Sequence, residues 1–80
     1  MKQKNNFISS FTDPANPQDE YLVGVKDNLI TIYFDEVQRE ENSQAEAEDL
    51  MQIFLDTEGI DGVVATAYQL VPGFWSAPII

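Results

Sequence analysis

The sequence predicts an α+β fold: a two-layer ββαβ arrangement in which an antiparallel sheet of three to four strands carries one amphipathic helix on one face. Three observations indicate this class. Two β-rich segments flank a short polar turn, a helical repeat of apolar residues follows them, and a third β-rich segment comes after the helix. A single helix in this order buries its apolar stripe against one face of the sheet, and this produces two layers.

Residues 1–19 are predicted to form an N-terminal arm without a regular element. The pairs Asp13-Pro14 and Asn16-Pro17 favour turns, and each proline disfavours helix in the residue that precedes it. Phe7 and Phe11 lie close together in this arm. We expect this aromatic pair to dock on the main body, because both rings would otherwise be exposed beside a solvated loop.

Residues 20–34 predict an antiparallel hairpin. The segments 21–25 and 29–34 are rich in β-branched and aromatic residues, and Asp27 and Asn28 between them tolerate the left-handed conformation of a tight turn. Both faces of these strands carry apolar or aromatic side chains, whereas a sheet with one face in water alternates apolar with polar. Something must therefore cover the second face: the Phe7/Phe11 arm, the C-terminal tail, a second copy of the chain, or a partner.

Residues 35–42 are polar and predict a loop or a frayed helical turn, and a helix is expected over roughly 43–58. Ser43 and Glu46 have the spacing of a capping box, and Gly59 supplies a left-handed C-cap after which Ile60 contacts the last turn. Five apolar residues follow the 3.6-residue period and define the face of the helix that meets the core: Ala47, Leu50, Met51, Phe54 and Leu55.

A third strand is predicted over residues 63–71, ending at Pro72-Gly73 because proline cannot donate to a strand ladder. The apolar tail that follows is either a short edge strand or an extended segment packed on the sheet. The expected organisation is therefore an arm over 1–19, a single α+β domain over 20–73 and an apolar C-terminal tail over 74–80.

Acidic residues are concentrated in one part of the chain. The chain has 14 acidic and 4 basic residues and a net charge of −10. Half of the acids lie between residues 35 and 49, where Arg39 is the one basic residue. We predict a basic partner, contacted by the acids of this segment and of the outer helix face together with an aromatic pair from the tail: Asp35, Glu36, Glu40, Glu41, Glu46, Glu48, Asp49, Asp56, Phe74 and Trp75.

Composition also excludes several classes of function. A negative chain repels nucleic acid and anionic membrane surfaces, so neither is an expected direct partner. Without His or Cys the chain has no imidazole base, no thiolate and none of the usual zinc or haem ligands, and residues 56–62 lack the spacing of a calcium loop. We therefore expect no enzyme activity, no cofactor and no metal. No apolar run suits a signal peptide or a membrane span, so the expected location is cytoplasmic.

Two functions remain as hypotheses. The first is a non-enzymatic inhibitor or regulator that presents its acidic segment to the basic surface of a larger, nucleic-acid-binding protein, in the manner of a DNA mimic. The composition of the chain is similar to that of small phage-encoded inhibitors, such as antirestriction, anti-CRISPR and uracil-DNA glycosylase inhibitor proteins, which are short, acidic and without catalytic residues. The alternative is a homo-oligomeric structural or accessory subunit, for example a homodimer, that uses an apolar sheet face and the Phe74-Trp75 tail.

Overall fold

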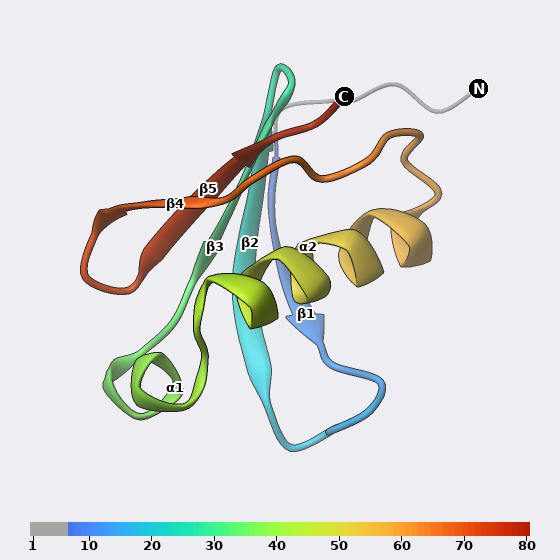
Figure 1. Cartoon of the computed structure of the whole chain (residues 1–80). Coiled ribbons are helices and arrows are strands. Elements are labelled where there is room, and N and C mark those ends of the chain that lie inside the picture. Colours follow the sequence, from blue (N-terminus) through green and yellow to red (C-terminus); the bar gives the residue numbers. More distant parts are fainter. Residues whose placement is uncertain (1–6) are drawn as a thin grey trace.

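Five antiparallel strands and two helices make up the part of the chain that the computed structural model describes, residues 7–80. The strands form one sheet in the order β1-β2-β3-β5-β4, and α2 crosses one face of it (Figure 1). The α+β class is therefore confirmed, but the sheet has five strands rather than three or four, and a second helix is present. In chain order the elements are β1 (Phe7–Thr12), β2 (Glu20–Lys26), β3 (Leu29–Tyr33), α1 (Glu36–Glu41), α2 (Gln44–Glu58), β4 (Tyr68–Val71) and β5 (Phe74–Pro78).

The two ends of the chain both contribute strands to the sheet. The prediction of no regular element in the arm is wrong for residues 7–12, because β1 pairs with β2 from Phe7 opposite Val25 to Thr12 opposite Glu20. Two serines interrupt the apolar pattern of β1, so the strand depends on its neighbour rather than on local propensity. The first six residues of the expected arm, and the side chain of Phe7, lie outside the described residues.

The tail is a strand inside the sheet. Phe74–Pro78 form β5, which pairs with β3 on one side and with β4 on the other. Of the two expectations for this segment, a strand is therefore correct, although it is not at the edge of the sheet. The edge positions belong to β1 and β4.

The hairpin and the long helix match their predictions. Strands β2 and β3 are joined by Asp27 and Asn28, and Asp27 has a positive φ of 57°. The capping box between Ser43 and Glu46 begins α2, and Gly59 ends it in the left-handed conformation. These local signals are strong because each satisfies backbone groups that a helix end leaves without partners.

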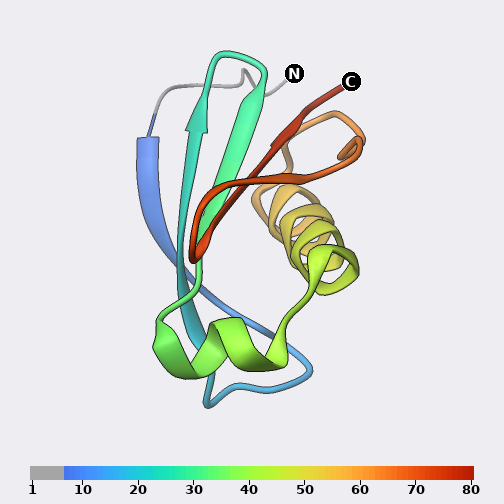
Figure 2. The same cartoon turned by 60° about the vertical axis from the view of Figure 1, so that its left-hand side comes forward.

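One apolar core lies between α2 and the sheet (Figure 2). All five residues of the predicted helix stripe are buried, and the inward-facing side chains of β2 and β3 meet them. The ring of Phe11 packs edge-on against Phe54 with 5.5 Å between ring centroids. Phe11 therefore docks on the main body as predicted, and it does so from β1.

The predicted strand 63–71 exists only over its last four residues. Upstream of β4, Val64 forms an isolated bridge with Ile79, and side chains of α2 bind the backbone between residues 62 and 67. The amide of Gln52 accepts from the Val64 N–H at 2.8 Å, the carboxylate of Glu48 accepts from the Ala67 N–H at 2.8 Å, and Gln44 donates to the Ala67 carbonyl at 2.7 Å. Gln44, Glu48 and Gln52 are spaced by four and therefore lie along one side of α2. Their hydrogen bonds take the place of a strand ladder for this segment.

The segment 35–42 contains a capped helix rather than a frayed turn. Asp35 and Gln38 form a reciprocal capping box, with the Gln38 N–H donating to Asp35 at 2.9 Å and the Asp35 N–H donating to Gln38 at 3.0 Å. The Gly73 carbonyl, in the β4–β5 turn, accepts from the Phe34 N–H at 2.7 Å just before α1. Gly73 has a φ of +91°, and a Cβ at this position would lie 2.6 Å from the Phe34 carbonyl oxygen.

We expect Gly73→Ala to lower the free energy of unfolding by about 2–4 kcal/mol, because a positive φ and a backbone clash add together. Gly59→Ala is the matched control, since Gly59 also has a positive φ but no atom lies within 4 Å of an added Cβ. It should cost about 1 kcal/mol. Urea denaturation of both variants measures the difference, and equal losses would contradict the close approach of the turn to β3.

Candidate binding surfaces

Four of the eight predicted acidic contact residues stabilise the fold itself. Asp35 caps α1, Glu46 caps α2, and Glu48 accepts from the backbone of Ala67. Asp56 accepts from the side-chain amide of Gln52 at 3.2 Å. These carboxylates are already engaged with N–H groups of the chain, so they are less available to a partner than sequence spacing suggested.

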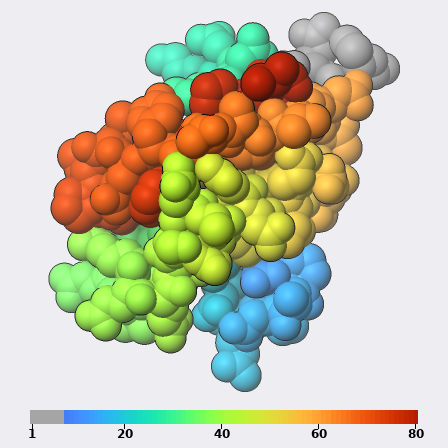
Figure 3. Space-filling model, viewed as in Figure 1, coloured from blue at the N-terminus to red at the C-terminus, as the bar shows by residue number. Residues whose placement is uncertain are grey.

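The other four acids make no such contact, and we refer to them together as the acidic helical surface: Glu36, Glu40 and Glu41 on α1 and Asp49 on α2. All four are exposed, and within residues 7–80 none has a hydrogen-bond or ion-pair partner. The two helices come to the front of the molecule together in Figure 3, where residues 36–58 appear in green to yellow.

Arg39, the one basic residue among these acids, lies against the β4–β5 turn. Its Nε and Nη2 atoms are 3.2 and 3.1 Å from the position that a Cβ on Gly73 would occupy. The Nε atom is buried, with no hydrogen-bond partner in the described part of the chain. Arg39 therefore packs against the turn and makes no ion pair with the described carboxylates, which leaves the four acids of the acidic helical surface without an ion-pair partner among residues 7–80.

The charges of α1 are not arranged for the stability of that helix. Glu36 is near the positive N-terminal end, but Glu40 and Glu41 are in the last turn, where the helix dipole favours cations. Glu36 and Glu40 are also four residues apart, a like-charge spacing that costs about 0.2–0.5 kcal/mol. The Debye length of about 8 Å at physiological salt does not screen such neighbours. An external cationic surface would relieve this repulsion.

Two titratable groups have shifted pKa values, and both shifts are away from neutral pH. Hydrogen bonds from the Ser43 hydroxyl and backbone lower the pKa of Glu46. Burial, reinforced by the nearby Asp19 and Asp13, raises the pKa of the Tyr21 phenol. Neither shift creates a group that would exchange a proton near pH 7.

The predicted aromatic pair is divided between the two faces of the sheet. Neighbouring side chains of a strand point to opposite faces, and Trp75 packs half-buried against the core. Phe74 lies on the other face, with its ring centroid 4.6 Å from that of Tyr33. Phe74 and Trp75 therefore do not form one contact site, and Phe74 lies on the face opposite α2.

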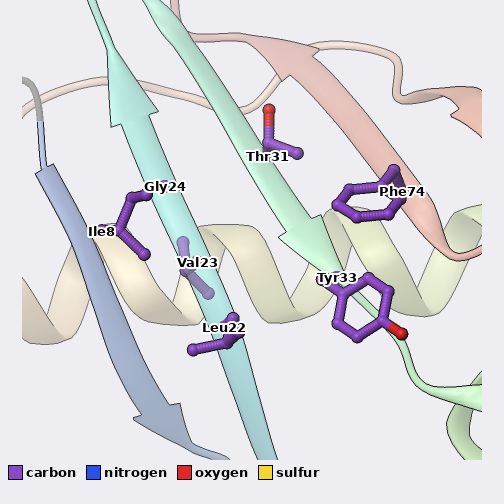
Figure 4. A pocket seen from close by; sticks show the side chains of 7 residues that line it. All are labelled: Ile8, Leu22, Val23, Gly24, Thr31, Tyr33 and Phe74. Carbon is purple, nitrogen blue, oxygen red and sulfur yellow. The ribbon is translucent and has the colours of Figure 1, made fainter.

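The face of the sheet opposite α2, here called the outer sheet face, contains an apolar hollow of about 330 Å³ (Figure 4). Gly24 lies between Ile8 of β1 and Thr31 of β3 in the strand register, so the middle of the face lacks a side chain. The lining residues are Ile8, Leu22, Val23, Gly24, Thr31, Tyr33 and Phe74. The hairpin sequence predicted a second apolar face, but the contributions of Ile8 and Phe74 to it follow only from the pairing of β1 and β5 with the hairpin.

Within residues 7–80, no group of three or more acidic side chains is arranged to hold a metal ion. Neither helix of this part is both long and apolar enough to cross a membrane. Comparisons with protein-family models, with curated proteins and with solved structures find no match to this chain. Function is therefore inferred from the two surfaces.

Truncating each of two neighbouring acids on α2 should change the free energy of unfolding by different amounts. Glu48→Ala removes the acceptor of the buried Ala67 N–H and should lower the free energy of unfolding by about 1–3 kcal/mol. Asp49→Ala should change it by less than about 0.5 kcal/mol, because Asp49 is exposed and makes no contact of this kind. Urea denaturation distinguishes the two, and a larger loss for Asp49→Ala would contradict these assignments.

Ser43→Ala should raise the pKa of Glu46, because the Ser43 hydroxyl is the largest cause of its lowered value. The lowered pKa contributes stability that is present above the ordinary glutamate pKa and is lost as pH falls through the folded-state value. An NMR titration of the Glu46 carboxyl measures the change directly. Ser10→Ala on β1 is the control and should leave the titration of Glu46 unaltered.

Proposed function

We propose that this chain is a non-enzymatic protein-binding inhibitor or regulator whose acidic helical surface docks on a basic surface of a larger protein. The observation that carries the proposal is the set of four exposed carboxylates on α1 and α2 that have no cationic partner within residues 7–80. Arg39, the nearest candidate to neutralise them, is packed against Gly73 instead. A cationic partner would supply the missing counter-charge.

Nucleic-acid-binding proteins are the class of partner that this surface suits best. Duplex DNA carries one negative charge per about 1.7 Å of its axis, so the proteins that bind it present grooves lined by Lys and Arg. The exposed carboxylates of α1 and α2 would supply such a groove with negative charge in place of the DNA phosphates. Occupying the groove would exclude DNA, which gives inhibition without any catalytic residue. The compositional likeness to small acidic phage inhibitors agrees with this proposal.

The test compares two triple variants of equal charge. Glu40→Gln, Glu41→Gln and Asp49→Asn remove three carboxylates from the acidic helical surface while keeping the capping residues intact. Asp27→Asn, Glu58→Gln and Asp61→Asn remove three exposed carboxylates from the β2–β3 turn and from the end of α2 and the loop that follows. Each variant is immobilised beside the unaltered chain, and nuclease-treated lysate from the source organism is passed over all three at low salt.

We expect the unaltered chain and the second variant to retain a basic nucleic-acid-binding protein, which mass spectrometry identifies. With the purified partner, the first variant should bind at least about tenfold more weakly. High salt and excess duplex DNA should each release the partner. Binding that resists both, or that the two triple variants weaken equally, would show that the acidic helical surface is not the contact.

A further inference from the structure

The outer sheet face is not covered by the segments expected to cover it. Residues 7–12 of the arm and residues 74–78 of the tail are strands β1 and β5, so they extend the sheet sideways instead of lying on its face. Helix α2 packs on the opposite face, behind the sheet in the view of Figure 4. On the outer face Ile8 is 81% exposed and Leu22 is 51% exposed.

The charge of this face is nearly neutral, in contrast to the net charge of −10 for the chain. Alternation along β1, β2, β3 and β5 places two charged residues at outward positions, Glu20 and Lys26. They lie at opposite ends of β2 and have opposite signs. The centre of the face consists of Leu22, Gly24 and their neighbours across the strands, where no like charge opposes a second copy.

We propose that the outer sheet face is the interface of a homodimer, in which two copies pack sheet against sheet. The two-fold axis lies between the sheets, perpendicular to the strands, and passes over the middle of β2. This axis brings Glu20 of each copy over Lys26 of the other, so the same ion pair forms twice by symmetry. The Gly24 hollow gives apolar side chains of the second copy room to enter between Ile8 and Thr31.

The area of the face is close to the lower limit for such a dimer. Five strands about 4.8 Å apart and about 20 Å long present roughly 450–500 Å² per copy, or about 900–1,000 Å² in total. Specific interfaces begin at about 1,000 Å² of total buried area, so the expected dimer is a weak one, of micromolar affinity. A face of this size with unpaired charges would not suffice, because burying a charge without a partner opposes association.

Sheet-to-sheet packing also separates the negative charge of the two copies. Helix α1 lies at the end of the sheet where β2 begins and β3 ends (Figure 2), and the two-fold axis reverses the strand direction, so the α1 helices of the two copies lie at opposite ends of the strands, about 20 Å apart. This exceeds the Debye length of about 8 Å, so little repulsion remains at physiological salt. Added salt should strengthen the dimer or leave it unchanged, whereas it should weaken binding of a basic partner.

Analytical ultracentrifugation of the full chain, from low micromolar to several hundred micromolar, tests the proposal. We expect the 9.0 kDa chain to approach twice its mass as concentration rises. Leu22→Lys should raise the dissociation constant about tenfold or more, because it places like charges near the two-fold axis. Val63→Lys is the control, since Val63 is 63% exposed but lies in the segment before β4 and not on the outer sheet face.

A charge pair distinguishes this interface from any other. Leu22→Lys and Leu22→Glu should each be monomeric alone and should form a heterodimer when mixed, because opposite charges then meet near the axis. Circular dichroism of each variant shows that it is folded. A monomer at all concentrations, a dimer that Leu22→Lys leaves intact, or a mixture that fails to associate would overturn the proposal. None of these outcomes depends on the acidic helical surface.

Discussion

Burial of the apolar stripe of α2 against the inner sheet face is the constraint on which the rest of the structure depends. The apolar stripe occupies only one side of α2, so this helix can cover only one face of the sheet. In a chain of 80 residues this leaves little apolar area for other contacts, and the opposite face stays exposed. The same packing orients α2 so that its remaining sides face solvent and the segment before β4.

The polar side of α2 that borders the segment before β4 supplies the hydrogen bonds that a neighbouring strand would otherwise supply. Gln44, Glu48 and Gln52 bind the backbone of residues 62–67, which would otherwise leave N–H and carbonyl groups buried without partners. Three of the eight candidate acidic contacts, Asp35, Glu46 and Glu48, are already used by a bond of this kind or by a helix cap. A cluster of acids in a sequence is therefore not equivalent to an acidic surface, because carboxylates near helix ends and loops are the natural acceptors for unpaired N–H groups.

The two candidate surfaces have different chemistry. The acidic helical surface depends on long-range charge and acts through a partner of opposite sign, while the outer sheet face depends on shape and apolar contact. Helix α1, which carries three of the four acids, lies at one end of the sheet (Figure 2). A dimer formed through the outer sheet face would place the two α1 helices at opposite ends of the paired strands.

Short-range patterns by themselves determined the β2–β3 hairpin, the limits of α2 and its buried stripe, because capping groups and apolar periodicity act between residues only a few positions apart. Asp35 and Gln38 also have the spacing of a capping box, but the many charged residues between 35 and 42 favoured the prediction of a loop. Only the tertiary structure decided that β1 and β5 are strands, that residues 62–67 are held by α2, and that Phe74 and Trp75 face opposite sides of the sheet. Each of these depends on a partner distant in the sequence, and the hydrogen bonds and packing that such a partner supplies leave no local signal.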